Sequence, residues 1–311
     1  MQDYDYTYVY LSSPTHTGST LLGFLLGAHP QVATVGEIAF QFSQEIPCSC
    51  GKPFCECEFW TDWQRRVLDA GLPFDIGRLE INLQPFHGSG LLESLFFYEF
   101  PYWPINSVRN GVYRFPGLRK YWHEKAVDAV NRTYQYAGIL CQREKAPVFL
   151  DTSKNPYQIR FLATHPKIRF KLIYMIRDGR AQINSNMRRE NRTLELAIKE
   201  LKWVSRNIER AAAHYLRPED VFRLRYEDLC ADLNGTLKSL YRFLNIDNTY
   251  TIDKLDLDDI SNFHIIGNVM RLNFDGNIKL DQKWKRELSA SQLAHINEEI
   301  GPLNRLYGYE D

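Results

Sequence analysis

The fold is decided by residues 8–22, which read YVYLSSPTHTGSTLL. An apolar, β-prone run ends at Ser12-Ser13-Pro14, and a Gly18-Ser19-Thr20 turn then opens a second apolar run. This order predicts a strand, a loop and the N-terminus of a helix. Such a loop directs several backbone N–H groups and the positive end of a helix dipole at one point, which suits an anion. We therefore expect a phosphate-binding loop here.

The spacing of this loop is that of the P-loop motif G-x-x-x-x-G-K-[ST], with two substitutions. Ser13 stands at the position of the first glycine, and Ser19 stands at the position of the lysine. The loop keeps the backbone cradle but lacks the cation that reaches the β and γ phosphates of a nucleoside triphosphate. The sequence therefore favours an anion other than a triphosphate.

A second phosphate-binding site is predicted in mid-chain. Residues 170–176 (FKLIYMI) form a mostly apolar run of strand length, which ends in Arg177, and Ser185 follows eight residues later. Arginine offers a bidentate fork to a phosphate and serine offers a single hydrogen bond. Because ligands of open α/β sheets bind at the carboxyl ends of the strands, we expect both phosphate-binding sites at that edge of the sheet.

These residues make the chain similar to the PAPS-dependent sulfotransferases, whose donor is 3′-phosphoadenosine 5′-phosphosulfate (PAPS). Residues 15–22 resemble the 5′-phosphosulfate loop, and Arg177 and Ser185 match the 3′-phosphate pair. Residues 225–229 (RYEDL) resemble the segment whose tyrosine lies beside the adenosine. Residues 267–271 (GNVMR), followed by Trp284, resemble a late loop that closes over the donor in many bacterial members. The resemblance spans roughly residues 6–50 and 147–290.

The resemblance implies a donor site and a reaction. The residues expected to bind the donor are Thr15, His16, Thr17, Gly18, Ser19, Thr20, Arg177, Ser185, Arg189, Tyr226, Asn268 and Arg271. The expected enzyme moves a sulfonate group from PAPS to a hydroxyl acceptor and leaves 3′-phosphoadenosine 5′-phosphate (PAP), with no catalytic metal. The hydroxyl could belong to a carbohydrate, a phenol, a lipid or a tyrosyl peptide.

The candidates for the chemistry are Glu37, His16 and Lys154, with His29 as a second candidate for the base. Glu37 is the candidate base, because a similar His-Pro…Gly-Glu run carries the base in the tyrosylprotein-sulfotransferase branch; His29 is the second candidate, although its place before Pro30 is typical of a helix end. The leaving phosphate needs electrostatic stabilisation. Family members usually place Lys or Arg where this chain has His16, and neutral imidazole donates only one hydrogen bond. Lys154 matches a second lysine of related enzymes and is expected to supply the charge.

Two other functional classes stay open. The first is a P-loop kinase-like nucleotide enzyme, against which stand Ser19 and the lack of a clear acidic magnesium site after residues 170–176. The second is a relative that binds the nucleotide without catalysing transfer. It stays open because His16 stands where family members usually have the Lys or Arg that supplies the charge.

Composition agrees with an ordinary globular enzyme. The 311 residues are 44% hydrophobic and 24% charged, and the formal net charge is zero. No global field therefore draws the chain to nucleic acid or to an anionic membrane. No run resembles a membrane span, and residues 1–6 lack the basic and apolar regions of a signal peptide. We expect a cytoplasmic protein.

Short β-type runs alternate with helical patterns along the chain. Residues 6–11, 147–151, 170–176 and 221–225 are the predicted strands, and helices are predicted after the phosphate loop, from residue 193 towards 218, and over 233–244. This alternation predicts an α/β fold, a P-loop-like doubly wound parallel sheet flanked by helices. We expect a single domain over residues 1–311.

Residues 38–146 are expected to be an irregular, aromatic-rich helical insertion on the acceptor side. Its rings either line an acceptor pocket or fill the core of a subdomain. They are Phe86, Phe96, Phe97, Tyr98, Phe100, Tyr102, Trp103, Tyr113, Phe115, Tyr121 and Trp122.

The insertion opens with four of the six cysteines within ten residues: Cys48, Cys50, Cys55 and Cys57. C-x-C spacing with Gly and Pro between could hold a tetrahedral zinc ion. A free-thiol turn that packs neighbouring aromatic rings and a pair of tight disulfides are the alternatives, although the compartment disfavours disulfides.

Overall fold

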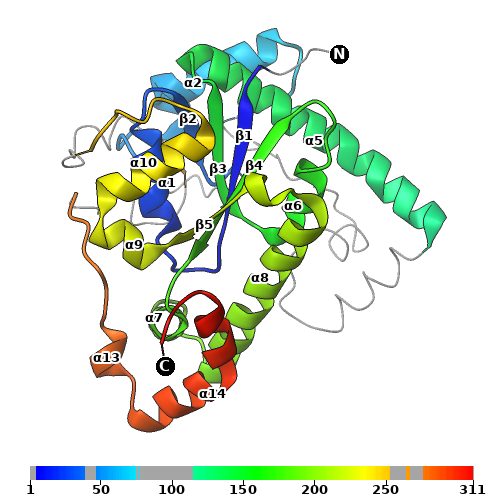
Figure 1. Cartoon of the computed structure of the whole chain (residues 1–311). Helices are drawn as coiled ribbons and strands as arrows, with labels where there is room; N and C mark the ends of the chain where they lie inside the picture. The colour runs from blue at the N-terminus through cyan, green and yellow to red at the C-terminus, as the bar shows by residue number, and fades with distance from the viewer. Residues whose placement is uncertain are drawn as a thin grey trace.

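The computed structural model describes residues 5–38, 47–74, 76, 115–252, 264–266 and 276–310. At its centre lies a five-stranded, wholly parallel sheet in the order β2-β3-β1-β4-β5 (Figure 1). The strands are β1 (Thr7–Ser12), β2 (Val32–Gly36), β3 (Val148–Lys154), β4 (Arg169–Ile176) and β5 (Val221–Arg225). This is the predicted α/β class.

Four of these strands match the predicted runs to within a few residues, and β2 was not predicted. Its five residues read VATVG, which is too short to display a period. β2 is a strand because β3 pairs with it in parallel, and the Thr34 hydroxyl donates to the Leu150 carbonyl at 2.8 Å. Tertiary pairing, rather than local propensity, makes this element.

The two faces of the sheet are both covered by helices, and β1 shows why. Its alternation sends Tyr8 and Tyr10 into one hydrophobic core and sends Val9 and Leu11 into another. The helices over the Val9 face are α1 (Ser19–Gly27), α9 (Tyr226–Ala231) and α10 (Leu233–Leu244). Those over the Tyr8 face are α2 (Glu58–Asp69), α5 (Pro116–Glu144), α6 (Pro156–Leu162) and α8 (Leu194–Tyr215).

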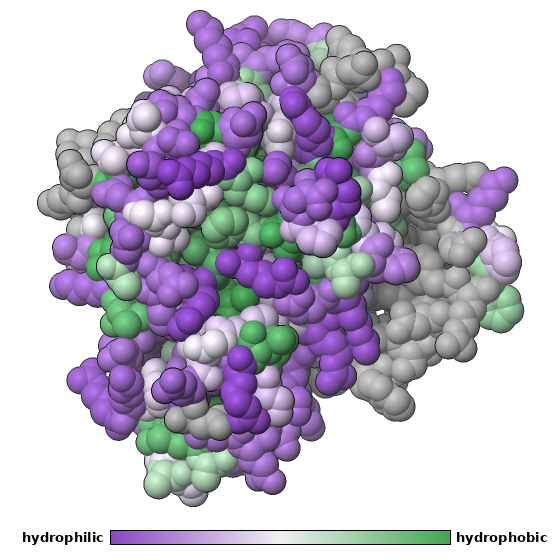
Figure 2. All heavy atoms as spheres, viewed as in Figure 1, coloured by the Kyte–Doolittle hydropathy of each residue, from purple (hydrophilic) through white to green (hydrophobic). Residues whose placement is uncertain are grey.

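Figures 1 and 2 show the same arrangement from one side. Helices lie on both sides of the sheet, and hydrophilic residues cover most of the described surface in view, with hydrophobic residues showing near its centre and in smaller groups towards its edges. Each large side chain buried between helix and sheet stabilises the fold by roughly 1.5–3 kcal/mol. Among the described helices, none is both long and apolar enough to cross a bilayer.

A third hydrophobic cluster lies beyond the carboxyl end of β4. It joins α8 to α7 (Gly179–Glu190), α13 (Trp284–Glu287) and α14 (Ala290–Leu306), which gather below the sheet in Figure 1. Gly179 makes the close approach possible, because a Cβ there would lie 2.2 Å from Ile300 Cδ1. Asp178 caps α7 by accepting from the Arg180 N–H at 2.9 Å. The start of α7 is thereby fixed beside the sheet edge.

The described part of the predicted insertion is helical, as expected, with the short turn η1 (Phe54–Glu56) before α2. A second short turn, η2 (Pro218–Asp220), precedes β5. Among the predicted acceptor-side rings, Phe115 is described and is 62% exposed. The side chains of the other ten lie outside the described residues.

Candidate active site

The phosphate loop lies where the sheet topology predicts a ligand. β1 is the central strand, its neighbours β3 and β4 lie on opposite sides, and the chain leaves its carboxyl end into α1. Gly18 has a φ of 94°, and a Cβ at this position would lie 2.7 Å from a ring carbon of Tyr226. Both the backbone conformation and the packing therefore require glycine here.

The two predicted phosphate-binding sites, the loop after β1 and the pair Arg177 and Ser185, line one cavity of about 200 Å³ at this edge. Segments that are far apart in sequence meet there: the loop after β1, the end of β3, the link from β4 to α7, the middle and last turn of α7, the start of α9, and the segment before α13. The lining residues are His16, Gly18, Ser19, Thr20, Leu21, Lys154, Arg177, Ser185, Arg189, Tyr226 and Asp281. A cavity with this many cations and helix N–H groups suits a polyanion.

Arg177 ties the cavity together. It is buried; its Nη1 donates to the His16 carbonyl at 2.8 Å, and its Nη2 donates to the Asp281 carbonyl at 3.0 Å. Its guanidinium lies 4.8 Å from the centre of the Tyr226 ring, a cation–π contact. Its Nε has no hydrogen-bond partner among the described residues. The Arg177 side chain thus contacts the loop, the aromatic ring and the segment before α13 and holds the three together.

His16 brings little positive charge to the cavity. Burial lowers its pKa below 6.5, and the nearby cations Arg189, Lys154 and Arg177 lower it further, against the opposing effect of Glu190. Its Nε2 lies 3.3 Å from Glu190 Oε1. At neutral pH the imidazole is therefore uncharged, and the positive charge of the cavity comes from the two arginines and Lys154.

Glu37 and Lys154, two of the candidate catalytic residues, are in direct contact. Lys154 Nζ lies 2.6 Å from Glu37 Oε1, and both side chains are largely buried. The contact follows from the pairing of β2 with β3, because Lys154 ends β3 and Glu37 comes directly after β2. The Glu37 N–H also donates to the Ile266 carbonyl at 3.0 Å, which fixes the backbone of this residue.

Asp151 was not predicted as part of the site and lies behind this pair. It is 2% exposed, and it accepts hydrogen bonds from the Tyr8 hydroxyl at 2.7 Å and from the Ser153 N–H at 2.9 Å. Burial raises its pKa to about 6, and the neighbouring Glu37 carboxylate adds to the rise. The available signal was an acidic residue inside the apolar run 148–151, a position that costs free energy unless it is partnered.

Asp281 was also missed. It lines the cavity, and its carboxylate lies 3.7 Å from Arg177 Nη2 and 3.9 Å from Arg188 Nη2. An acidic side chain beside these guanidiniums occupies a position that a phosphate would compete for. The sequence carried no sign of this, because only the fold brings residue 281 to α7.

Some predicted residues lie away from the cavity lining. Thr15 is exposed, and Thr17 is fully buried with its hydroxyl donating to the Pro14 carbonyl at 3.0 Å. His29 is buried at the end of α1, with its Nε2 2.9 Å from the Asp247 carbonyl and its Nδ1 accepting from the Gln31 N–H. These bonds give His29 a structural role at the helix end. Asn268 and Arg271 lie outside the described residues.

The cysteine cluster is only partly as predicted. Cys48, Cys50 and Cys57 lie together, and the fourth member of the group is His264 rather than Cys55, which is exposed. All six cysteines are free thiols. The expected alternative of tight disulfides is therefore not what the structure shows.

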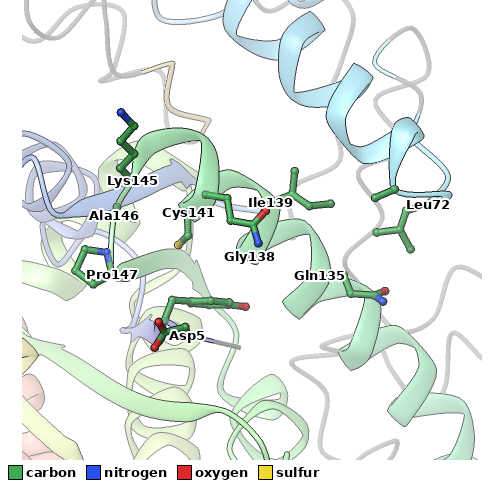
Figure 3. Close-up of a pocket in the computed structure, with 12 residues that line it drawn as sticks. Asp5, Leu72, Gln135, Gly138, Ile139, Cys141, Lys145, Ala146 and Pro147 are labelled. Carbon is green, nitrogen blue, oxygen red and sulfur yellow. The ribbon is translucent and has the colours of Figure 1, made fainter. Parts of the chain in front are cut away.

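A larger cavity, of about 770 Å³, lies at the opposite end of the sheet (Figure 3). Asp5 and Pro147, which line it, come just before β1 and β3, and half of the other lining residues belong to α5. Its charged lining residues are one acid and one base, Asp5 and Lys145. The described lining of this cavity therefore offers no cluster of cations for a polyanionic donor.

Comparison with known proteins agrees with this geometry. A model described as "Sulfotransferase family" matches residues 106–250, which include β3, β4, Arg177 and Ser185. No curated protein sequence matches closely enough to count as a relative. The sulfotransferase domain of the Synechococcus PCC 7002 olefin synthase has a similar fold, with a TM-score of 0.51 and 17% identity over 100% of this chain and 97% of that chain.

Two further solved structures are similar at lower scores. The sulfotransferase domain of the curacin biosynthetic pathway aligns with a TM-score of 0.49 and 16% identity, over 99% of each chain. Sulfotransferase STF9 from Mycobacterium avium aligns with a TM-score of 0.49 and 12% identity, over 100% of this chain and 78% of that one. The chain thus matches a sulfotransferase family model over residues 106–250 and shares its fold with a sulfotransferase domain.

Proposed function

We propose that this chain is a sulfotransferase, which transfers a sulfonate group from PAPS to a hydroxyl acceptor. The observation that carries the proposal is the single cavity lined by the loop after β1, by Lys154 and by Arg177 with Ser185. PAPS carries a phosphate on its 3′ oxygen and a phosphosulfate on its 5′ oxygen, so it needs two anion-binding sites that line the same cavity.

Each of the two anion-binding sites would bind one charged end of the donor. Backbone N–H groups at the start of α1, around Ser19 and Thr20, would receive the 5′-phosphosulfate, because a helix N-terminus favours negative charge. Arg177, Ser185 and Arg189 would receive the 3′-phosphate. The ring of Tyr226 already packs on Arg177 and would lie beside the adenosine.

The ion pair of Glu37 and Lys154 is suited to the transfer step. When the phosphosulfate enters, its negative charge competes with Glu37 for Lys154 and leaves the carboxylate able to accept a proton. The acceptor oxygen then forms a bond to sulfur as the bond from sulfur to the donor phosphate breaks. The proton goes to Glu37, and the electron pair of the broken bond goes to PAP, where Lys154 and the loop N–H groups stabilise it.

The proposed acceptor is a hydroxyl group. Carbohydrates, phenols, lipids and tyrosyl peptides could all be used with the same donor site, so the experiment tests all four classes. We would incubate the purified chain and PAPS with a mixed library of such hydroxyl compounds and search for mass gains of one sulfonate. A Glu37→Gln variant that binds PAP like the wild type but gives no such gain is the matched control. Sulfonate transfer by the wild type alone is the expected result.

Binding measurements separate the other two classes. A kinase-like enzyme would be stabilised against thermal unfolding by ATP with magnesium more than by PAP, which would contradict the proposal. A non-catalytic relative would bind PAP tightly and transfer sulfonate to no member of the library, and this would contradict it equally.

A further inference from the structure

A cluster of four side chains outside the donor cavity has the composition of a metal site. The sulfurs of Cys48, Cys50 and Cys57 and one ring nitrogen of His264 all lie within 4.8 Å of one another. Cys50 Sγ lies 3.7 Å from Cys57 Sγ, which lies 3.9 Å from Cys48 Sγ. His264 Nδ1 lies 3.4 Å from the Cys48 sulfur and 3.3 Å from the Cys57 sulfur.

These separations match the edges of a zinc tetrahedron. With Zn–S bonds of about 2.3 Å and Zn–N bonds of about 2.0 Å at tetrahedral angles, two sulfurs lie about 3.8 Å apart and a sulfur and a nitrogen about 3.5 Å apart. A disulfide instead needs its sulfurs at about 2.0 Å. We propose that Cys48, Cys50, Cys57 and His264 bind one Zn²⁺ ion.

The backbone around the sulfurs is arranged to support thiolate ligands. The turn from Cys48 to Gly51 closes by a Gly51 N–H to Cys48 carbonyl hydrogen bond of 2.9 Å, and Gly51 has a φ of 84°. The N–H of Cys50 donates to the Cys48 sulfur. Cys57 stands at the N-terminus of α2, where the N–H groups of Phe59 and Trp60 donate to its sulfur. Such hydrogen bonds orient metal ligands and disperse their charge.

Two of the four proposed ligands, Cys48 and Cys57, are shielded from solvent, and Cys50 and His264 are half-buried. Cys48 and Cys57 are 0% and 1% exposed. The Phe59 ring stacks on the His264 ring, with centres 4.6 Å apart and planes 13° apart. Four protein ligands in a buried setting are typical of a structural zinc site, since a catalytic site keeps one position open.

Charge near the cluster is also complementary. Three thiolates and one neutral imidazole around Zn²⁺ carry one net negative charge. Lys52 and Arg143 both act electrostatically on His264, and the Arg143 guanidinium lies 4.6 Å from the centre of the Phe59 ring. Soft sulfur ligands at tetrahedral spacing select zinc over the harder magnesium and calcium ions.

The metal would join two distant parts of the chain beside the candidate base. Ile265 and Ile266 follow His264; the Ile265 N–H donates to the Ser49 hydroxyl at 3.0 Å, and the Ile266 N–H donates to the Val35 carbonyl at 2.7 Å. The Ile266 carbonyl in turn accepts from the Glu37 N–H. The zinc would therefore hold the cysteine turn and the segment 264–266, which bridges to Gly36 at the end of β2, together. This makes its ligands positioning residues for Glu37.

Metal analysis tests the site without any activity measurement. The full chain, purified without a metal-binding tag from zinc-containing medium, is expected to hold about one zinc per chain by mass spectrometry of the metal. Cys50→Ser and His264→Ala should lower this content at least tenfold. Cys55→Ser and Cys230→Ser are the matched controls and should retain the metal, because neither thiol belongs to the cluster.

Cobalt substitution keeps the test valid if a variant fails to fold. The wild-type chain loaded with Co²⁺ should show thiolate charge-transfer absorption and the visible bands of a tetrahedral ion. The proposal is overturned if the wild type purifies without metal and takes up neither Zn²⁺ nor Co²⁺, if its intact mass is two hydrogens short for a disulfide, or if Cys55→Ser loses as much zinc as Cys50→Ser. PAP binding, measured in parallel, reports on the donor site independently.

Discussion

Lys154 and Glu37 meet as an ion pair, with Nζ 2.6 Å from Oε1, at the adjoining ends of β3 and β2. In the chain without donor, the candidate cation and the candidate base neutralise each other. Of the two, Lys154 lines the cavity that we propose for the donor. This relationship makes the pair a unit whose two members should respond differently to donor and to acceptor.

Lys154→Ala should lower turnover by about a hundredfold or more while changing PAP affinity much less, because the lost charge acts chiefly on the leaving phosphate as the bond to sulfur breaks. Single-turnover transfer and calorimetry with PAP measure the two effects. Lys145→Ala is the matched control: Lys145 also has a positive φ (56°) but is exposed at the end of α5, far from the cavity. Equal losses of rate and of affinity in Lys154→Ala would refute the role.

Glu37→Gln should lower the transfer rate by about 10²- to 10⁴-fold, the range typical of a lost general base, and leave PAP affinity nearly unchanged. Because the two side chains touch, the double variant with Lys154→Ala should be less impaired than the product of the two single effects. A double-mutant cycle on the single-turnover rate measures this coupling. Strict additivity would mean that the pair does not act as a unit.

Arg177→Ala should weaken PAP by about 10- to 100-fold more than it weakens adenosine monophosphate, since a hydrogen bond to a charged group contributes about 1.5–3 kcal/mol. Arg177 also holds the His16 carbonyl, so some loss for both nucleotides is expected. The difference between the two nucleotides, measured by calorimetry, isolates the 3′-phosphate. Ser185→Ala should show the same preference with a smaller effect, and equal losses for both nucleotides would contradict the assignment.

His16→Gln should keep a pH–rate profile like that of the wild type between pH 6.5 and 8. Burial lowers the pKa of His16, so the imidazole is already neutral in this range and has no charge to lose as the pH rises. Steady-state kcat/KM across this range provides the comparison. A fall with rising pH that is present in the wild type and absent from the Gln variant would show that His16 acts as a cation.

Asp151→Asn should gain stability relative to the wild type by up to about 3 kcal/mol between pH 4 and pH 7. Burial raises the pKa of Asp151 to about 6, against about 3.9 in an unfolded chain, so the native state holds the proton more tightly. The stability contributed by the protonated form is complete below pH 4 and is lost as the pH rises through 6. Urea unfolding at several pH values measures the difference.

Asp62→Asn is the control of opposite sign for this experiment. Hydrogen bonds from Arg66, Arg143 and Arg65 hold the pKa of Asp62 below its usual range, so its contribution is present above pH 4 and is lost on acidification. The cost of Asp62→Asn should therefore grow as the pH rises. If Asp151→Asn behaved in the same way, the carboxyl of Asp151 would be ionised in the native state at low pH.

Much of the fold could be predicted because its strands and helices carry their own local patterns. The runs 170–176 and 221–225 are apolar and bounded by polar turns, and residues 233–244 keep a helical stripe, so each matched an observed element. β2 could not be predicted, because its five residues become a strand only by pairing with β3. The cavity-lining residues Gly18, Arg177 and Ser185 could be predicted because they belong to short motifs whose spacing is local.

By itself, the sequence determined which chemical groups the chain offers and how they are ordered: a loop suited to an anion, an arginine followed eight residues later by a serine, and a run of closely spaced thiols. The tertiary structure decided which of them meet. Contact between Glu37 and Lys154, the place of Asp281 at Arg177, and the exchange of Cys55 for His264 all join segments about 100 residues apart or more. Such contacts depend on strand order and helix packing, and no local pattern encodes the distance between residues that only the folded sheet brings together.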